Sequence, residues 1–274
     1  MGRNRGLTKT FGQEKPIIGA LHFSPLLGYK GFRDLNEVLK NALLDLKALE
    51  MGGVNGVVLE NNYDFPHRIF VNPETVAAMT YLGAEIRKRT NLPLGVSVLW
   101  NDYKASLSIA KVIGGAFVRI SSFVDDISTD FGEIHPDPDE IVAYRKSIGA
   151  EKIALFSDIQ VKYSKNLNGQ PIERSAMEAE KKCADAVIVS GKATGEPPAI
   201  EKLVSCKNSV GIPVLIGSGM DAKNAASLLR YADGAIVGTY FKAGKISGKE
   251  RNAKPYTARV DVSKVKKLMR TLSV

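Results

Sequence analysis

Residues 213–219 read PVLIGSG, a short apolar run that ends in a glycine-rich turn. Such a run is typical of a strand buried on both faces of a parallel sheet. The pattern returns downstream, where residues 234–237 read GAIV before Gly238 and Thr239, and upstream, where residues 186–190 read AVIVS. Segments with helical patterning separate these runs. This alternation predicts βα units around a parallel sheet.

The same apolar character marks five more expected strands, at residues 16–23, 56–61, 93–100, 116–123 and 153–160. Capping signals such as Asp34 with Glu37, Asn72-Pro73 and Asp137-Pro138 open helices between them. Eight strands with intervening helices predict one closed (β/α)8 barrel, a TIM barrel, for which 274 residues is an ordinary length. The alternative, an open doubly wound sheet, usually has a Gly-x-Gly-x-x-Gly fingerprint after its first strand, where this chain has His22-Phe23-Ser24-Pro25.

No change of composition divides the chain, so residues 1–274 are expected to form a single domain. Residues 1–15 are basic, and we expect a flexible arm there, with a short organelle-targeting segment as the alternative. Residues 242–274 contain ten Lys or Arg against two acidic residues, so they carry +8 of the net charge of +9. We expect a solvated basic segment with a final helix over residues 261–272; contact with an anionic partner or membrane surface is the alternative.

The composition indicates a cytoplasmic protein. Two cysteines are too few for a disulfide framework, no secretory signal is visible, and no apolar run reaches the roughly 20 residues that cross a bilayer. The basic segment has one aromatic residue, Tyr256, so it lacks the stacking platform of a single-strand binder, and no nucleic-acid partner is expected. The sequence leaves open whether the protein forms a homo-oligomer.

The C-terminal ends of the strands form the active site of such a barrel. The last three ends are glycine-rich, and glycine lets backbone N–H groups approach an anion. A helix expected to begin near Asp221 would add the positive end of its dipole. We therefore predict a barrel of the phosphate-binding type, with ordinary tight turns as the alternative. The predicted phosphate-binding residues are Ser190, Gly191, Thr194, Gly195, Gly217, Ser218, Gly219, Gly238 and Thr239.

Polar side chains follow the other strands as well. The candidate catalytic residues are His22, Glu60, Asn101, Asp158 and Lys162. A carboxylate and an amine in a dry barrel mouth have tunable pKa values, so Asp158 or Glu60 is the expected base and Lys162 the expected stabiliser of negative charge. Schiff-base formation is a further role open to Lys162. The alternatives are that Asp158 and Lys162 form an ion pair that closes the barrel mouth, and that His22 is a core residue without a catalytic role.

Three scattered histidines offer no transition-metal spacing, so no such site is expected. Mg²⁺ bound by Glu60, Asp158 and a substrate phosphate is the one metal site that the sequence leaves open. The chain has neither a Gly-x-Ser-x-Gly nucleophile motif nor a Walker A phosphate loop.

From about Pro16 to Lys242 the ordered set of motifs resembles the BtpA/SgcQ family of barrel proteins. The resemblance rests on Gly19-Ala20-Leu21-His22-Phe23-Ser24-Pro25-Leu26, on residues 56–66 (GVVLENNYDFP), on Val98 to Asp102, on Asp158-Ile159-Gln160-Val161-Lys162, on Ser190-Gly191 with Thr194-Gly195, on Gly217-Ser218-Gly219 with Asn224, and on Ala232 to Thr239. Two positions depart from the pattern: Trp100 replaces a usually basic residue, and Tyr163 replaces a common histidine.

Two functions are expected from these observations. The first is an enzyme acting on a small phosphorylated metabolite, such as a sugar phosphate or a nucleotide-like compound, and the polar strand ends favour it. The second is a non-catalytic assembly factor for a membrane protein complex, which the basic C-terminal segment favours. The resemblance implies a phosphate-binding barrel, and it links one family branch to photosystem I biogenesis and another to a sugar operon.

Overall fold

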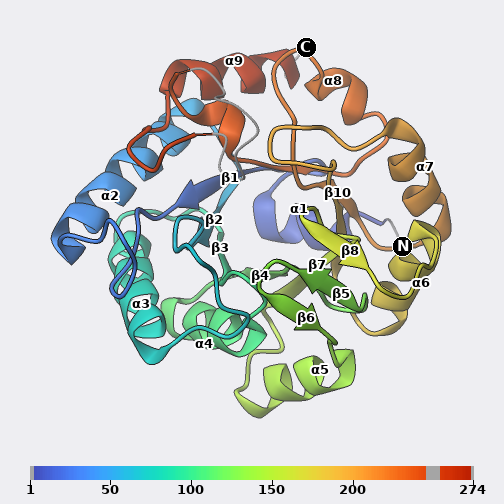
Figure 1. The fold of residues 1–274 in the computed structure, drawn as a ribbon. Coiled ribbons are helices and arrows are strands. Elements are labelled where there is room, and N and C mark those ends of the chain that lie inside the picture. Colours follow the sequence, from blue (N-terminus) through green and yellow to red (C-terminus); the bar gives the residue numbers. More distant parts are fainter. Residues whose placement is uncertain (1–2, 245–253, 273–274) are drawn as a thin grey trace.

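In the computed structural model, which describes residues 3–244 and 254–272, eight parallel strands close into a barrel inside a ring of helices (Figure 1). In the order in which they pair around the ring, the strands are β1 (Ile17–His22), β2 (Gly56–Glu60), β3 (Leu94–Ser97), β4 (Phe117–Ile120), β7 (Ala154–Ile159), β9 (Ala186–Val189), β10 (Val214–Ile216) and β11 (Ala235–Val237). The pairing of β1 with β11, with Ile18 opposite Ile236, closes the barrel. The predicted single (β/α)8 fold is confirmed.

The helices that surround the barrel are α2 (Leu35–Gly52), α3 (Pro73–Arg87), α4 (Tyr103–Ile113), α5 (Pro138–Ser147), α6 (Ile172–Lys181), α7 (Ile200–Ser209), α8 (Ala225–Leu228) and α9 (Val262–Leu272), and a 3-10 turn, η1 (Thr239–Phe241), follows β11. A side-chain cap explains where α5 begins. Asp137 accepts hydrogen bonds from the backbone N–H groups of Asp139 and Glu140, at 2.9 and 3.0 Å. Asp34 and Asn72, the other two expected caps, make no such side-chain bond. None of the helices in the described residues has both the length and the apolar character needed to cross a membrane.

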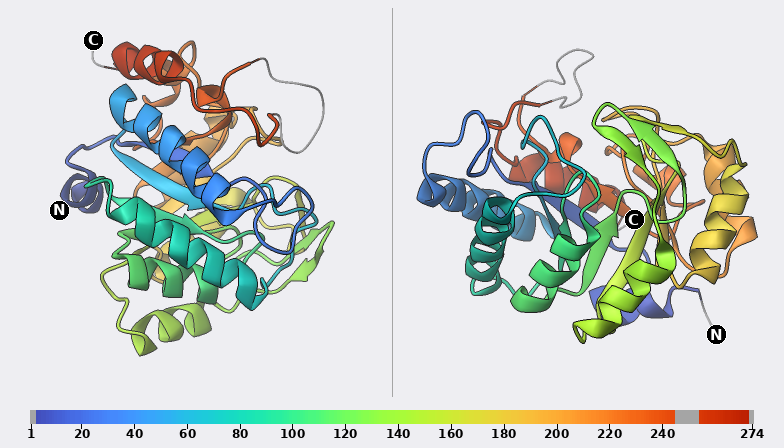
Figure 2. Two further views of the ribbon diagram at one scale, coloured as in Figure 1. Left: turned by 90° about the vertical axis from the view of Figure 1, so that its left-hand side faces the viewer. Right: turned by 60° about the horizontal axis from the view of Figure 1, so that its bottom comes forward.

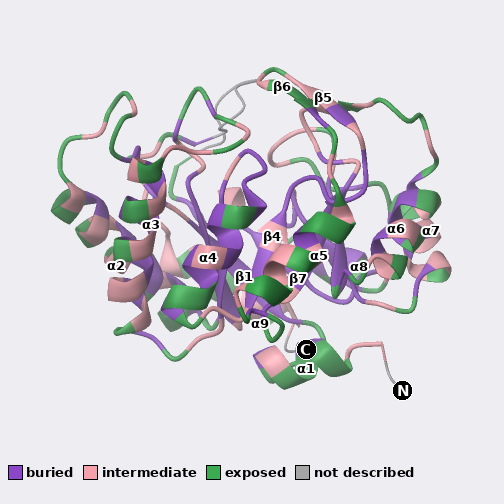
Figure 3. Ribbon diagram, turned by 90° about the horizontal axis from the view of Figure 1, so that it is seen from below, coloured by how far each residue is buried: buried purple, intermediate pink, exposed green. Residues whose placement is uncertain are grey.

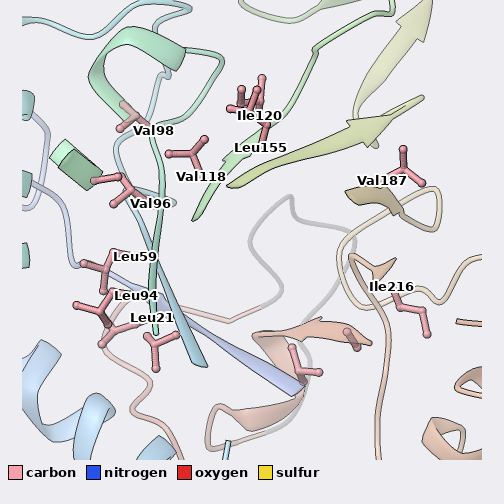
Figure 4. Close-up of a cluster of buried hydrophobic side chains, with 14 of the residues drawn as sticks. Leu21, Leu59, Leu94, Val96, Val98, Val118, Ile120, Leu155, Val187 and Ile216 are labelled. Carbon is pink, nitrogen blue, oxygen red and sulfur yellow. The ribbon is translucent and has the colours of Figure 1, made fainter. Parts of the chain in front are cut away.

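The apolar core has two layers, because successive strand residues point to opposite faces of the sheet. Inside the barrel, Ile18 and the rings of Phe117 and Phe156 belong to one cluster, and those two rings stack at 4.7 Å between centroids. Between the strands and the helices lies a larger cluster that contains Leu21 and Leu59 (Figure 4). The barrel interior is thus filled with side chains below its C-terminal mouth.

The N-terminal arm, expected to be flexible, is instead a helix, α1 (Arg5–Phe11). Its apolar residues Leu7 and Phe11, four positions apart, are buried in the inner cluster. The ring of Phe11 meets that of Phe117 edge-on at 5.6 Å between centroids. In Figure 3, α1 lies at the opposite end of the molecule from β5 and β6. The flexible-arm prediction is therefore wrong, because this apolar pair seals the N-terminal end of the barrel.

A small antiparallel sheet is formed by the segments that follow β4 and β7. It contains β5 (Ile127–Thr129), β6 (Gly132–Ile134) and β8 (Ser164–Asn166), with β5 paired to both neighbours. An apolar cluster with Trp100 and Val161 includes Ile127 and Ile134 of this sheet. Three-residue strands with polar sequences carry little propensity of their own, so packing decides their conformation. The sheet joins the loops after β4 and β7 at the mouth of the barrel.

The basic C-terminal segment is partly built into the fold. Its final helix, α9, is confirmed and packs beside α2 (Figure 2). Lys242 and Lys254 are buried, and Arg259 forms an ion pair with the buried Asp45, 3.0 Å between Nη1 and Oδ2. The expectation of a solvated segment is therefore wrong for these three residues. The basic residues Lys245, Lys249 and Arg251 lie outside the described part of the chain.

Phe11→Ala is expected to lower the free energy of unfolding by about 3–5 kcal/mol, because removing a buried aromatic ring leaves a cavity at the base of the barrel. Lys9→Ala, an exposed change on the same helix, is the matched control and should stay within about 0.5 kcal/mol of the wild type. Urea unfolding followed by circular dichroism measures both. Equal effects of the two substitutions would show that α1 does not seal the barrel.

Candidate active site

A cavity of about 110 Å³ opens at the C-terminal ends of the barrel strands. Side chains reach it from opposite sides of the barrel: His22 ends β1, Glu60 ends β2, Arg119 lies in β4, and Lys162 follows β7. The turns after β9, β10 and β11 complete the wall. The predicted site residues that line this cavity are His22, Glu60, Lys162, Thr194, Gly195, Gly217, Ser218, Gly219, Gly238 and Thr239.

Four predicted site residues lie elsewhere. The side chain of Asn101 donates to the backbone oxygen of Ser122 at 2.9 Å and accepts from its N–H at 2.8 Å, so it joins the ends of β3 and β4. Asp158 is buried behind Arg119. Ser190 and Gly191 line a neighbouring cavity. Asn101 is thus placed as a positioning residue, whereas Asp158 acts on the site through Arg119.

The centre of the site is Arg119, which was not among the predicted catalytic residues. Its Nη1 donates to Glu60 Oε1 at 3.0 Å. Its Nε and Nη2 donate to Asp158 Oδ2 and Oδ1, at 2.7 and 3.1 Å, in a bidentate pair. A charged residue in an otherwise apolar strand, FVRI, was the signal in the sequence. The alternative Asp158–Lys162 ion pair is wrong: among the described residues Asp158 pairs with Arg119 alone.

This pairing keeps Glu60 ionised. Burial by itself would raise the pKa of Glu60, but the charge of Arg119 and the hydrogen bond with His22 lower that pKa to about 2. The two carboxylates in turn raise the pKa of Arg119 against the effect of its own burial. A carboxylate with so low a pKa is a poor proton acceptor at neutral pH. Glu60 therefore fits an orienting role better than the role of base.

His22 is the better proton acceptor. Its Nε2 lies 3.2 Å from Glu60 Oε2. Burial lowers the pKa of His22, and the hydrogen bond to Glu60 offsets this only in part, so the ring is neutral at pH 7. Because Glu60 is an ionised acceptor, Nε2 carries the proton and Nδ1 a lone pair. That Nδ1 is buried and has no hydrogen-bond partner among the described residues.

Lys162 is half-buried between two cavities. Burial and the nearby charge of Arg119 lower its pKa to about 8. The backbone around it is strained: Gln160 and Tyr163 have φ values of 46° and 61°, in a region that non-glycine residues rarely adopt. The buried Asp125 accepts from the N–H of Gln160 at 2.8 Å and holds this turn. Such strain is typical of residues that are placed for function.

Trp100 and Tyr163, the two residues that depart from the family pattern, both make structural contacts at the mouth of the barrel. The hydroxyl of Tyr163 accepts a hydrogen bond from the backbone N–H of Thr194 at 2.7 Å, which links the turn of Lys162 to the turn after β9. Trp100 packs in the apolar cluster under the small sheet. Tyr163 and Trp100 therefore both help to shape the walls of the barrel mouth.

Two of the glycines predicted to bind phosphate, Gly191 and Gly219, are needed for the packing of the loops. A Cβ at Gly191 or Gly219 would lie within 2.3 Å of the backbone of Glu196 or Pro197, so neither position tolerates a side chain. The hydroxyl of Ser218 accepts from the N–H of Gly191 at 2.9 Å and donates to the oxygen of Glu196 at 2.8 Å. These bonds join the turns after β9 and β10 and leave the N–H of Gly191 unavailable to a ligand.

Other backbone donors on these turns have no partner in the described part of the chain. Within the described residues, no hydrogen-bond acceptor is found for the N–H groups of Ser218, Gly219, Gly238 and Thr239. All four residues line the cavity. Unpaired backbone donors at one wall suit an anion such as phosphate.

The helix expected to begin near Asp221 does not contribute. The Asp221 carboxylate accepts from the N–H groups of Lys223 and Asn224 at 2.7 and 3.0 Å, and the helix that follows, α8, has only four residues. The prediction of a helix dipole at the phosphate is therefore wrong, because a side-chain carboxylate already occupies those donors.

Buried cations add positive charge to the cavity. Lys242 Nζ lies 3.1 Å from the hydroxyl of Tyr63 and 4.6 Å from the centre of its ring. Burial lowers the pKa of Lys242 to about 8. The charged groups that line the cavity are Arg119, Lys162, Lys242 and Lys254 against Glu60 and Asp221. This excess of cations favours an anionic ligand.

The Mg²⁺ expectation does not fit this arrangement. The guanidinium of Arg119 stands between Glu60 and Asp158 and binds both carboxylates. A divalent cation on the same oxygens would lie against a fixed positive charge. In residues 3–244 and 254–272, no three His, Cys, Asp or Glu side chains are grouped to hold a metal ion.

The chain has close relatives in sequence. A model of the BtpA family matches residues 13–273. A protein of Archaeoglobus fulgidus is 39% identical over 239 residues, which cover 87% of this chain and 96% of the relative. The Photosystem I biogenesis protein BtpA of Synechocystis is 34% identical over 240 residues, which cover 86% of this chain and 83% of that protein.

Solved barrels share the fold at low sequence identity. A thiamine phosphate pyrophosphorylase from Pyrococcus furiosus has a TM-score of 0.56 at 15% identity, with 95% of this chain and 96% of that chain covered. N-(5'-phosphoribosyl)anthranilate isomerase from the same organism has a TM-score of 0.57 at 12% identity, with 94% and 98% covered. At this identity the likeness shows the barrel fold.

Arg119→Met is expected to cost about 3–5 kcal/mol of unfolding free energy at pH 7, because it leaves two buried carboxylates unpaired. The loss should shrink as the pH falls toward 4. In the wild type, Glu60 stabilises the fold above its ordinary pKa of 4.5, and this contribution is lost as the pH falls toward about 2. In the variant, burial raises the pKa of Glu60, so protonation relieves the penalty.

Urea unfolding at pH 7 and pH 4 measures this difference. Arg230→Met, at an exposed position, is the control and should be nearly neutral at both values. A penalty for Arg119→Met that is the same at both pH values would contradict the assigned pairing.

Proposed function

The chain belongs to the BtpA family, and we propose that it is an enzyme that acts on a small phosphorylated metabolite, such as a sugar phosphate or a nucleotide-like compound. One observation carries the proposal: a single cavity combines free backbone donors after β10 and β11 with His22, Arg119 and Lys162. The first group suits a phosphate, and the second suits proton transfer and charge stabilisation. Phosphate sites of such barrels commonly lie after the last two strands.

The phosphate binds at the N–H groups of Ser218, Gly219, Gly238 and Thr239. The positive charges of Lys242 and Lys254, on the same cavity, attract the dianion. Gly238 leaves the space beside the imidazole open, since a Cβ there would lie 3.0 Å from Cε1 of His22. The two solved barrels named above are themselves named for phosphorylated compounds, which agrees with this proposal.

Binding at the phosphate end positions the reacting end of the substrate against the other wall. There Nδ1 of His22 accepts or returns a proton, and Glu60 keeps the ring oriented through Nε2. Arg119 stabilises negative charge that develops on the substrate, because Asp158 holds its guanidinium fixed before the reaction. Glu60 and Asp158 act as positioning residues in this account.

The assembly-factor alternative stays a prediction. The name of the Synechocystis relative favours it. The described part of the basic segment gives it less support than the sequence suggested, since Lys242 and Arg259 have partners within the fold and Lys264 donates to the backbone oxygen of Lys242 at 2.7 Å.

Thermal unfolding against a panel of phosphorylated metabolites tests the proposed function, with inorganic phosphate and unphosphorylated analogues as controls. A ligand at about one hundred times its Kd adds roughly 2.7 kcal/mol, which corresponds to a Tm shift of ~5–10 °C in a chain of this size. Thr239→Glu should raise the Kd of the best ligand at least tenfold, because it adds negative charge at the phosphate. Thr239→Gln, the uncharged control, should change the Kd of this ligand by less than about threefold.

Two results would contradict the proposal. One is a cooperatively melting protein that no member of a broad panel stabilises. The other is a ligand whose affinity is the same in Thr239→Glu and Thr239→Gln, since such a ligand does not place its phosphate on the turn after β11.

A further inference from the structure

Lys162 stands where two cavities meet. The first is the phosphate cavity described above, and the second, of about 630 Å³, lies between the β8 segment and the turn after β9. Lys162 lines both. In the second cavity the walls include Lys192, Lys202 and Asn166, whose buried Nδ2 has no acceptor among the described residues. Among the described residues that line the two cavities, Lys162 is the one that belongs to both linings, so a ligand that occupied both would contact it.

In the part of the chain that the structure describes, the amine of Lys162 has no counter-ion of its own. No ion pair or hydrogen bond of its Nζ is found within the described residues. The two acids whose charges raise the pKa of Lys162, Asp158 and Glu60, are both bound to Arg119. A lysine that serves only the fold would be paired or solvated, because burying a lone ammonium is costly. This one lies half-buried on a strained turn and lines two cavities.

Lys242 provides an internal comparison. It lines the same cavity, but its Nζ donates to the Tyr63 hydroxyl and sits over the Tyr63 ring. Burial lowers the pKa of Lys242 to about 8 as well, but the contacts with Tyr63 occupy its nitrogen, so pKa alone does not separate the two lysines. Of these two lysines, Lys162 alone has a free amine at the junction of the cavities.

We infer that Lys162 is a nucleophile that forms an imine with a phosphorylated aldehyde or ketone. The inference rests on the proposed function and names its substrate class: a carbonyl compound with its phosphate on the turns after β10 and β11 and its remaining polar atoms in the second cavity. The lowered pKa of Lys162, about 8, supports it, since about a tenth of the amine is then neutral at pH 7, against less than ~0.1% for an ordinary lysine.

The step balances with the groups present. The lone pair of the neutral Nζ attacks the carbonyl carbon and forms a C–N bond, while the π pair moves to the oxygen, which takes a proton. The nitrogen sheds a proton to Nδ1 of His22, and His22 returns it to the hydroxyl. The hydroxyl leaves as water while the nitrogen lone pair forms the C=N bond. One amine, one carbonyl group and one proton from solvent thus give a protonated imine and one water.

Reductive trapping with a small probe tests the inference on the full chain. The protein is treated with glycolaldehyde phosphate and cyanoborohydride at pH 7, and the rate of alkylation of each lysine is measured by peptide mass spectrometry. Lys162 is expected to react at least tenfold faster than the exposed Lys192 and faster than Lys242. Inorganic phosphate should slow the reaction at Lys162 severalfold. Lys162→Arg, whose Tm reports folding, should lose this adduct and keep that of Lys192.

The outcomes separate the two proposals. If phosphorylated ligands stabilise the protein but Lys162 reacts no faster than Lys192, the imine is overturned and the phosphate site stands. If Lys162 reacts fastest but equally fast with unphosphorylated glycolaldehyde and without competition from phosphate, the lysine is a nucleophile and the phosphorylated substrate class is overturned.

Discussion

The site depends on the guanidinium of Arg119 between two buried carboxylates. Its three hydrogen bonds to Glu60 and Asp158 join β2, β4 and β7 across the barrel mouth. The same contacts set the chemistry around them. Because Arg119 neutralises both acids, Glu60 stays ionised and holds Nε2 of His22. Lys162 is left without a counter-ion among residues 3–244 and 254–272. A buried ion pair of this kind contributes specificity more readily than net stability.

The barrel itself could be predicted from sequence, and the reason is geometric. Strands buried on both faces appear as short apolar runs, and proline or Asx caps mark the helices after them. The ends of the strands therefore identified most of the cavity wall. His22, Glu60, Lys162 and the turns after β10 and β11 come together as the topology requires.

What could not be predicted depends on contacts between distant segments. The identity of the carboxylates' partner is one example, because strand position alone does not say whether Asp158 meets Lys162 or Arg119. The packing of the glycines is another: a Cβ at Gly219 would clash with the backbone of Glu196 and Pro197, a contact that strand position does not reveal. Helix α1 and the β5–β6–β8 sheet are too short to form from local sequence preference. Their packing against the apolar clusters decides their conformation.

The most direct test of the account is a crystal structure of the protein with a bound phosphorylated ligand, or with inorganic phosphate where no ligand has been identified. The phosphate is expected within hydrogen-bonding distance of the backbone N–H groups of Ser218, Gly219, Gly238 and Thr239, with the remainder of a ligand directed toward His22 and Lys162. A phosphate bound elsewhere, with these four donors facing only solvent, would contradict it.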